Sequence, residues 1–250
     1  MNKIIVNKNI IISDNQDVII DNNKIIFMKS LDYEIEYIDS DNISLEFVVD
    51  NVCVKLLESS FNNNINVCNK YTIKNGVMIV NKFYNNDNVC EKMVVDLLNE
   101  GSRFDYNFSN ICMGIENYEI NINHKYKNTI SNISNKSIAL KNSTLNFIIN
   151  SNVLCECVNS VLNQNTRIVT MGECDAKVEP NMFIDLDDVE ARHGSVIGAF
   201  RDDQVFYLMS KGINYSDTLK LLIKGYILSG VIVSVDIRKK ILDIIDKYWG

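Results

Sequence analysis

The sequence predicts a mainly β protein, a β-solenoid followed by a C-terminal α-helical segment. Up to about residue 200, short runs rich in isoleucine and valine recur every eight to twelve residues or so, separated by polar turn residues. Asparagine tolerates the left-handed backbone conformation and is abundant in these turns, whereas the whole chain holds ten glycines and one proline. After residue 201 the apolar residues adopt the spacing of amphipathic helices.

The expected strands follow one another with little sign of tight hairpins. Asn75-Gly76 is the one Asn-Gly pair in the chain, so a meander of two-residue hairpins is poorly supported. Single asparagines between runs suit the bends of stacked coils, which favours a solenoid over a sandwich, the alternative that the spacing leaves open. Strands are expected at residues 3–6, 10–13, 17–21, 24–28, 33–38, 43–50, 52–57, 71–74, 77–80, 118–122, 137–140, 144–149, 167–170 and 182–186.

Three helices are expected after the strands. Gly212 is a natural C-cap for a first helix over residues 204–211, and Asn214 is placed to cap a second helix. A third amphipathic run covers Val235–Trp249. The predicted units are therefore a β-helix core over residues 1–200 and a helical segment over residues 201–250.

Composition narrows the class of protein. The 250 residues are 46% hydrophobic and 23% charged, as in soluble globular proteins, and the net charge of −7 without a basic patch argues against nucleic acid as a partner. The apolar runs are too short to span a membrane, and the N-terminal residues lack the pattern of a signal peptide. Seven scattered cysteines do not form a disulfide framework, so we expect a reduced, cytoplasmic protein.

Motifs of common enzymes are missing from the sequence. It contains neither a phosphate-binding loop nor the glycine-rich dinucleotide motif, and neither a Gly-x-Ser-x-Gly nucleophile elbow nor a His-Glu-x-x-His zinc motif. The sequence contains only two histidines, His124 and His193, so it offers few candidates for the histidine of a catalytic triad. We therefore expect a protein that is not an enzyme.

Cysteine and histidine residues near the end of the β-region are candidate metal ligands. Cys155 and Cys157 are expected on one face of a strand, and Cys174 and His193 follow at intervals of about one coil each. Stacked coils would bring the four close enough to share iron or a cluster fragment. Simple packing in the core is the alternative for Cys155 and Cys157, and it is the expectation for Cys53, Cys68, Cys90 and Cys112.

An acidic stretch precedes His193. It could ligate a metal or orient the imidazole, and a solvated acidic turn explains the same residues equally well. The stretch consists of Asp185, Asp187, Asp188 and Glu190.

Three motifs lie close together in the last third of the chain. Residues 180–194 are P-N-M-F-I-D-L-D-D-V-E-A-R-H-G, residues 206–213 are F-Y-L-M-S-K-G-I, and residues 221–226 are L-L-I-K-G-Y. Together they resemble the C-terminal signature of the SufB/SufD family, the scaffold subunits of Suf iron–sulfur cluster assembly. Upstream, His124, Thr129 and Ser131 match the family's His-x-x-x-x-Thr-x-Ser segment.

The resemblance implies a right-handed parallel β-helix followed by helices, and a scaffold in place of an enzyme. Family members dock the SufC ABC-type ATPase through their C-terminal helices. They also pair through the end of the β-helix, so a SufB-like paralogue or a second copy is an expected partner. Iron or a nascent cluster would rest only transiently at that interface, with His193 and Cys174 as candidate ligands and no stable cofactor. The residues that would seat the ATPase are Phe206, Tyr207, Leu208, Gly212, Leu222 and Gly225.

Two positions around His193 bear on whether the chain is closer to SufB or to SufD. Gly194 after the histidine matches SufD, since SufB members usually carry an acid there. Ala191 stands where SufD members often carry a cysteine, so that thiol is lost or supplied by Cys174, Cys155 or the partner. The sequence thus predicts a SufD-like subunit. The alternatives are a homodimeric, SufB-like scaffold that itself binds iron or cluster, and a solenoid enzyme acting on sugars or acyl groups near residues 185–193.

Overall fold

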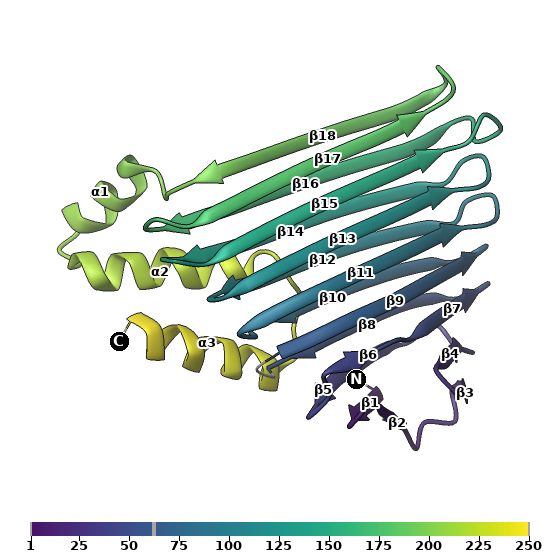
Figure 1. The fold of residues 1–250 in the computed structure, drawn as a ribbon, viewed down its shortest axis with the longest axis horizontal. Coiled ribbons are helices and arrows are strands. Elements are labelled where there is room, and N and C mark those ends of the chain that lie inside the picture. Colours follow the sequence, from purple (N-terminus) through teal and green to yellow (C-terminus); the bar gives the residue numbers. More distant parts are fainter. Residues whose placement is uncertain (1, 62–63, 250) are drawn as a thin grey trace.

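The computed structural model describes residues 2–61 and 64–249 and shows a parallel β-solenoid of about seven turns followed by three helices (Figure 1). Each coil contributes one strand to each of two sheets. The first sheet runs in the order β18 (Val189–Gly198), β16 (Ser160–Met171), β14 (Ile130–Leu140), β12 (Arg103–Cys112), β10 (Val77–Tyr84), β8 (Cys53–Ser60), β5 (Asp32–Ile38), β1 (Asn2–Asn7) and β2 (Ile10–Ile12). The second runs β17 (Asp175–Ile184), β15 (Thr144–Val153), β13 (Ile115–His124), β11 (Asn88–Leu97), β9 (Asn64–Lys74), β7 (Glu46–Asp50), β4 (Lys24–Phe27) and β3 (Val18–Asp21), with β6 (Asn42–Ile43) on β9.

The pairings confirm the predicted solenoid over the sandwich. From β5 onward, neighbouring strands of each sheet are parallel and come from successive coils, as in β10 with β12 and β11 with β13. The first strands differ, because β1 with β2 and β3 with β4 form antiparallel pairs at the N-terminal end. These hairpins end the two sheets where no earlier coil of the described chain stacks on them.

Asparagine has two roles in the coils. At the bends it adopts a left-handed backbone, as predicted, with φ between +47° and +66° at Asn22, Asn51, Asn75, Asn128, Asn142 and Asn159. Within strands it also stacks in ladders, a role that the sequence had not indicated. Asn150 Nδ2 donates to Asn121 Oδ1 at 2.8 Å, and Asn181 Nδ2 donates to Asn150 Oδ1 at 2.9 Å on the next coil. Such ladders hold adjacent coils in register.

The helices α1 (Asp202–Ser210), α2 (Tyr215–Leu228) and α3 (Val235–Trp249) follow the last strand. Asn214 caps α2, and its side-chain oxygen accepts a hydrogen bond from Asp217 N at 2.9 Å. Gly212 follows the end of α1 and has a φ of +87°. The predicted helices are thus present, with α1 beginning two residues earlier than expected. None of the helices among the described residues is both long and apolar enough to cross a membrane.

Helices α2 and α3 cover one end of the outer face of the first sheet (Figure 1). Ser109 Oγ donates to the carbonyl of Ile227 at 3.2 Å, which ties the end of α2 to β12. Gly230 lies so close to β12 that a Cβ there would be 2.2 Å from Ser109 Oγ. The buried side chains of this contact are Leu57, Phe83, Ile111, Ile138 and Val169 from the sheet with Phe200, Ile223, Ile227, Ile237, Ile241 and Ile245 from the helical side.

Candidate functional site at the last coil and the helices

The last coil, formed by β17 and β18, ends the solenoid without a further coil of the described chain stacked on it. Alternate residues of β18 are in register with buried residues of β16. Their side chains therefore point to the inner side of the solenoid, where the equivalent side chains of earlier coils form the core. These residues are Ala191, His193, Ser195 and Ile197, in register with Leu162, Gln164, Thr166 and Ile168. All four are exposed. The solenoid therefore presents an open end that includes His193.

A buried amide lies directly beneath His193. Gln164, in register with His193, donates from Nε2 to Ser151 Oγ at 2.8 Å and to the carbonyl of Asn181 at 3.3 Å. Its Oε1 is buried and has no hydrogen-bond partner in the described chain. The open end thus combines an exposed imidazole with an unsatisfied acceptor one coil below.

The four candidate metal ligands do not meet. Cys155 and Cys157 lie in the turn between β15 and β16, so the expectation that both occupy one strand face is wrong. The chain bends at residues 154–159 because β15 already ends at Val153. Cys155 is exposed, whereas Cys157 is buried and its Sγ donates to the carbonyl of His124 at 3.1 Å. Core packing, the alternative, therefore holds for Cys157. It was also the expectation for four other cysteines, and it is confirmed for the buried Cys112 but wrong for Cys53, Cys68 and Cys90, which are exposed.

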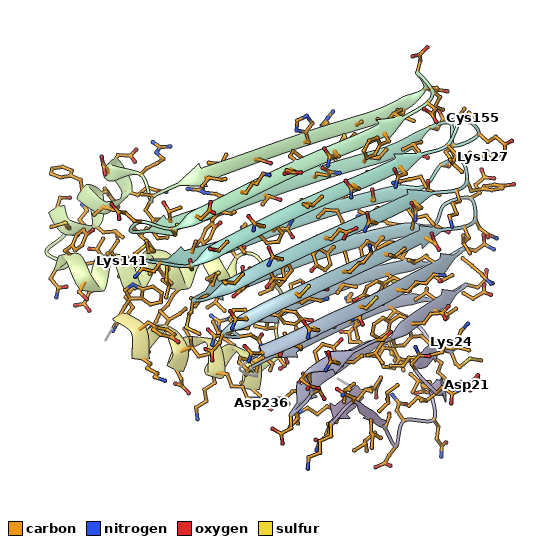
Figure 2. All side chains as sticks on the ribbon, viewed as in Figure 1. Asp21, Lys24, Lys127, Lys141, Cys155 and Asp236 are labelled. Atoms are coloured by element: carbon orange, nitrogen blue, oxygen red, sulfur yellow. The ribbon has the colours of Figure 1, made fainter. Side chains whose placement is uncertain are left out.

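Cys174 lies at the other end of the coils. It belongs to the turn between β16 and β17, where Asn142 N donates to the carbonyl of Glu173 at 2.8 Å. Figure 2 shows Lys141 of this stack of turns and Cys155 at opposite ends of the solenoid. The Cys174 thiol is half-buried, and burial followed by the nearby Asp175 carboxylate raises its pKa.

His193 and Cys174 are also far apart within one chain. His193 precedes the end of β18 by five residues, or about 16 Å of strand, and Cys174 lies beyond that end of the coil. One ion bound at about 2–2.3 Å from each ligand could not reach both. The described residues contain no group of three His, Cys, Asp or Glu side chains arranged to hold a metal ion.

The acidic stretch before His193 is a solvated turn. Asp185, Asp187 and Asp188 are exposed between β17 and β18, and Glu190 pairs with Arg192 at 2.8 Å on the outer face of β18. A solenoid enzyme would need these acids around a cavity with His193, and neither the acids nor His193 lines the cavity of about 670 Å³ beside the helices.

His124 has a structural environment. The imidazole is buried, with Nδ1 2.7 Å from Thr129 Oγ1 and Nε2 2.9 Å from Ser131 Oγ, and Thr129 Oγ1 is 2.9 Å from Ser160 Oγ on the next coil. Burial lowers the pKa of His124 to about 4, so the ring is neutral. The spacing His-x-x-x-x-Thr-x-Ser is therefore explained by a hydrogen-bonded corner between β13 and β14.

Of the residues that the resemblance assigns to ATPase docking, some are exposed and others are packed against the rest of the chain. Phe206 and Tyr207 of α1 are 74% and 60% exposed, and Gly212 is exposed after α1. Leu208 is half-buried, and Leu222 packs against the contact between α2 and the first sheet. We call the exposed apolar set the helix surface; it consists of Phe206, Tyr207, Met209, Tyr215 and Leu221.

Gly225 lies one turn after Leu221 on the exposed side of α2. A Cβ there would meet no atom within 4 Å, so packing within the chain does not require glycine at this position. Glycine inside a helix costs about 1 kcal/mol relative to alanine. The position is therefore costly for the isolated chain, and it leaves room for a close approach from outside.

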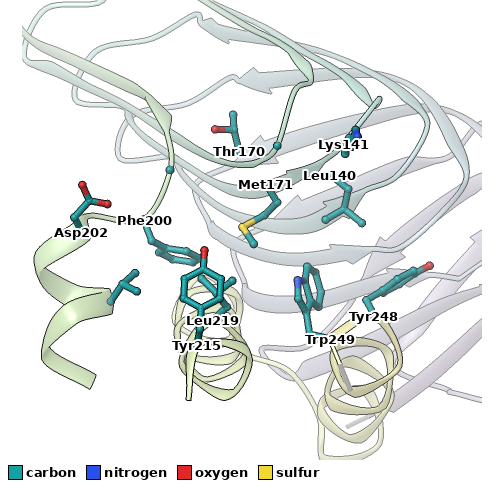
Figure 3. A pocket seen from close by; sticks show the side chains of 13 residues that line it. Leu140, Lys141, Thr170, Met171, Phe200, Asp202, Tyr215, Leu219, Tyr248 and Trp249 are labelled. Atoms are coloured by element: carbon teal, nitrogen blue, oxygen red, sulfur yellow. The ribbon is translucent and has the colours of Figure 1, made fainter. Parts of the chain in front are cut away.

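A cavity of about 670 Å³ adjoins the helix surface, where the turns of the last coils meet the helices. Phe200, Met171 and Tyr215 line one part of it, and Trp249 and Tyr248 line another (Figure 3). Tyr215 belongs to both the cavity and the helix surface. A side chain of a docked protein would find an apolar, largely aromatic recess here.

Comparison with known proteins identifies the family of the chain. The family model described as "SUF system FeS cluster assembly, SufBD core domain" matches residues 58–226. The iron–sulfur cluster assembly protein SufD of Escherichia coli is 38% identical over 64 residues, which cover 26% of this chain and 15% of that protein. An iron–sulfur cluster assembly SufBD family protein of Mycobacterium leprae is 38% identical over 63 residues, covering 25% and 16%. One of Synechocystis is 34% identical over 62 residues, covering 25% and 14%. These alignments span less than a fifth of the length of each relative.

Proposed function

Since the chain belongs to the SufBD family of the SUF iron–sulfur cluster assembly system, we propose that it is a SufD-like scaffold subunit without catalytic activity of its own. It works with a SufC-like ABC-type ATPase and with a second subunit of SufBD type, a SufB-like paralogue or another copy. The observation that carries the proposal is the open last coil, because a scaffold needs a surface that is incomplete without its partner. The similarity to SufD of Escherichia coli and Gly194 after His193 favour the SufD-like subgroup.

Iron and cluster are cargo in this proposal and not resident cofactors. His193 is exposed at the open end and would contribute an imidazole ligand to iron or a nascent cluster held between two subunits. Cys174 is too far from His193 to join it from the same chain, so it would act at a separate point of the interface. The seven cysteines are free thiols, which suits a reducing compartment, and we place the protein in the cytoplasm.

The ATPase is proposed to dock on the helix surface. Phe206 and Tyr207 expose large apolar area that nothing in the described chain covers, and aromatic anchors beside a recess are typical of binding hot spots. Leu222 supports this surface from beneath by packing α2 on the sheet. A homodimeric scaffold that itself binds iron is the second candidate, and the exposed His193 fits it equally.

Affinity capture of the tagged full chain from its host's lysate, made without oxygen, tests this function. Wild-type protein is expected to recover an ABC-type ATPase and a SufBD-type subunit, both identified by mass spectrometry. Phe206→Asp places a charge in the docking surface and is expected to reduce the recovered ATPase at least about tenfold while the second subunit is retained.

Tyr126→Asp is the matched control, because Tyr126 is an exposed aromatic residue in the turn between β13 and β14, away from the helices. It should retain both partners. Equal recovery of the ATPase with all three proteins would contradict docking on the helix surface. Recovery of neither partner by wild-type protein would contradict the scaffold function itself.

Gly225→Ala gives a test in which stability and binding move in opposite directions. The added methyl group meets open space and improves helix propensity, so the free energy of unfolding should rise by about 0.5–1 kcal/mol. Binding to the ATPase should weaken, because the methyl group fills the space reserved for close approach. Urea denaturation and titration with the purified ATPase measure the two effects. Unchanged affinity would remove Gly225 from the docking surface.

A further inference from the structure

Two thiols lie in one tight turn between β15 and β16. The turn covers residues 154–157 and is closed by Cys157 N, which donates to the carbonyl of Leu154 at 3.0 Å. Cα atoms two residues apart are separated by at most about 7 Å, and a turn brings them closer. A disulfide joins Cα atoms about 4.4–6.8 Å apart. Cys155 and Cys157 are therefore within reach of each other.

The two thiols differ in their access to solvent. Cys155 is exposed, so a small oxidant can reach it, whereas Cys157 is buried. Burial raises the pKa of the Cys157 thiol, and the nearby Cys155 and Glu156 add to the rise. Because the thiolate is the reactive form, Cys155 is the thiol that meets an oxidant first. An accessible thiol beside a second, resolving thiol is the arrangement found in redox-sensing sites.

The Cys157 thiol takes the place of a backbone donor in the stack of coils. Leu97 and His124 are in register at the ends of β11 and β13. The carbonyl of Leu97 accepts a hydrogen bond from Lys125 N at 3.0 Å. The carbonyl of His124, one coil further on, accepts from Cys157 Sγ at 3.1 Å. A disulfide has no S–H group, so oxidation of Cys157 removes this hydrogen bond.

Cys157 also supports the turn that precedes β18. Its side chain belongs to a small apolar cluster, and residues at both ends of the turn between β17 and β18 pack against this cluster. Asn159 N donates to the carbonyl of Asp188 at 2.7 Å and ties the two turns together. The cluster consists of Val153, Cys157 and Leu162, with Met182, Ile184, Leu186 and Val189 packed against them. Movement of the Cys157 sulfur toward Cys155 therefore takes away a support of the last coil.

We propose that Cys155 and Cys157 form a reversible redox site for hydroperoxides, and that their disulfide withdraws Cys157 from beneath the turn of the last coil. The inference goes beyond the proposed function and does not depend on it. In a reducing compartment such a disulfide is transient, because an exposed disulfide is readily reduced by cellular thiols.

The oxidation takes two steps, with the hydroperoxide as oxidant. The Cys155 thiolate attacks the hydroperoxide; an S–O bond forms, the O–O bond breaks, and the alkoxide or hydroxide that leaves takes a proton from solvent. The sulfur is thereby oxidised to a sulfenic acid, and the peroxide is reduced to an alcohol or water. The Cys157 sulfur then loses its proton and attacks the sulfenic sulfur, so that the S–S bond forms, the S–O bond breaks and water leaves. Two thiol molecules reverse the reaction by exchange and become a disulfide themselves.

Two other exposed cysteines provide an internal control. Cys68 is in register with Lys92, and Cys90 is in register with Asn66, so the two thiols lie diagonally on the neighbouring strands β9 and β11. Their Cα atoms are about 8 Å apart, given the spacing of strands and of residues along a strand. A disulfide does not span this distance without movement of the backbone. These cysteines therefore share the exposure of Cys155 but have no resolving thiol in each other.

Peptide mapping by mass spectrometry tests the site on the unmodified full chain, after treatment with a small excess of hydrogen peroxide and alkylation of the remaining thiols. The tryptic peptide 142–167 contains Cys155 and Cys157 and no other cysteine, whereas peptide 83–92 contains Cys90. We expect peptide 142–167 to lose two hydrogens and to escape alkylation, and dithiothreitol to restore it. Peptide 83–92 should be alkylated or gain oxygen. Alkylation of both cysteines in peptide 142–167, or only a gain of oxygen there, would overturn the inference.

Two substitutions test the order of the steps. Cys155→Ser removes the exposed thiol, and Cys157 should then remain reduced under the same treatment. Cys157→Ser keeps a donor for the carbonyl of His124, and Cys155 should then stop at the sulfenic acid, which dimedone traps. Oxidation of Cys157 in Cys155→Ser as fast as disulfide formation in wild-type protein would show that Cys155 is not the thiol that meets the peroxide.

Hydrogen exchange tests the effect on the last coil. In wild-type protein, oxidation should accelerate the exchange of amides in residues 184–189 at least about fivefold, because the turn loses the support of Cys157. In Cys157→Ser the same treatment should leave these amides unchanged. A disulfide that forms without faster exchange in residues 184–189 would overturn the link to the last coil. Capture of the ATPase and the SufBD-type subunit uses the reduced chain, so the proposed function stands or falls separately.

Discussion

Replacing Lys82 with methionine is expected to lower the free energy of unfolding by about 3–5 kcal/mol. Lys82 is completely buried between two carboxylates, with Nζ 2.6 Å from Glu91 Oε1 and 3.2 Å from Glu58 Oε2. Burial alone would lower the pKa of Lys82, but Glu58 and Glu91 reverse the effect and raise it, so the ammonium stays charged. Its removal leaves two carboxyl groups in the core without a cation.

The surrounding groups are arranged for this ion cluster. Tyr37 OH donates to Glu58 Oε2 at 2.8 Å, and Tyr71 OH donates to Glu58 Oε1. The Lys82 ammonium also lies 5.3 Å from the ring centroid of Tyr84, within the range of a cation–π contact. Burial raises the pKa of Glu91 despite the attraction of Lys82, so protonation of this carboxyl is the way in which the variant would relieve part of the cost.

Urea denaturation of wild-type and Lys82→Met protein measures the loss. Lys92→Met is the matched control, because Lys92 makes an exposed pair with Glu119 at 3.1 Å on the outer face and should cost less than about 1 kcal/mol. The triple variant Lys82→Met, Glu58→Gln, Glu91→Gln should recover part of the stability. If Lys82→Met and Lys92→Met lose the same amount, the buried ion cluster does not contribute as its geometry indicates.

The alternation of residues along β10 indicates that Lys82 is buried. Met78, Val80, Lys82 and Tyr84 occupy alternate positions of β10, and all four are buried. Strict alternation therefore places Lys82 in the core, although a charged residue is expected at the surface when taken alone. The same holds for Glu91 in β11, a strand missing from the expected set because polar residues interrupt its apolar pattern.

Pairs of consecutive apolar residues occur in the strands where the helices pack on the first sheet. Ile138-Ala139 and Ile168-Val169 each break the alternation near the end of a strand. In each pair one side chain enters the core of the solenoid and the other lies under α2 and α3. Alternation is consistent with the inward residues, but the outward ones depend on where the helices fold back, which no local pattern specifies.

The site was predicted unevenly for physical reasons. Family motifs singled out His193 and the C-terminal helices as candidates, but the exposure of His193 follows from β18 being the last strand of the stack, a property of the whole fold. The two-residue period misplaced Cys155 and Cys157, because it assumes a strand that had already ended at Val153.

Glu116 is expected to make the protein less stable as pH rises through neutrality. The carboxyl is buried in β13, where Tyr118 OH donates to Oε2 at 2.6 Å and Asn110 Nδ2 donates to the same oxygen. Burial raises its pKa from 4.5 to about 7. Between these values the folded chain holds a proton that the unfolded chain has released. The contribution to stability is therefore complete below pH 4.5 and is lost as pH rises through about 7, an effect of about 3 kcal/mol.

Glu116→Gln should remove this dependence, since glutamine stays neutral and can still accept from Tyr118. Compared with wild type, the variant should gain about 2–3 kcal/mol at pH 8 and little at pH 4.5, as measured by urea denaturation at both values. The difference between variant and wild type at each pH cancels the opposite effect of His124, whose neutral buried ring loses stability between pH 6.5 and about 4. Glu119→Gln, on the outer face of the same strand, is the control and should show no gain at pH 8. An equal change for Glu116→Gln at both pH values would mean that its effect comes from packing, and that the buried carboxyl does not ionise over this range.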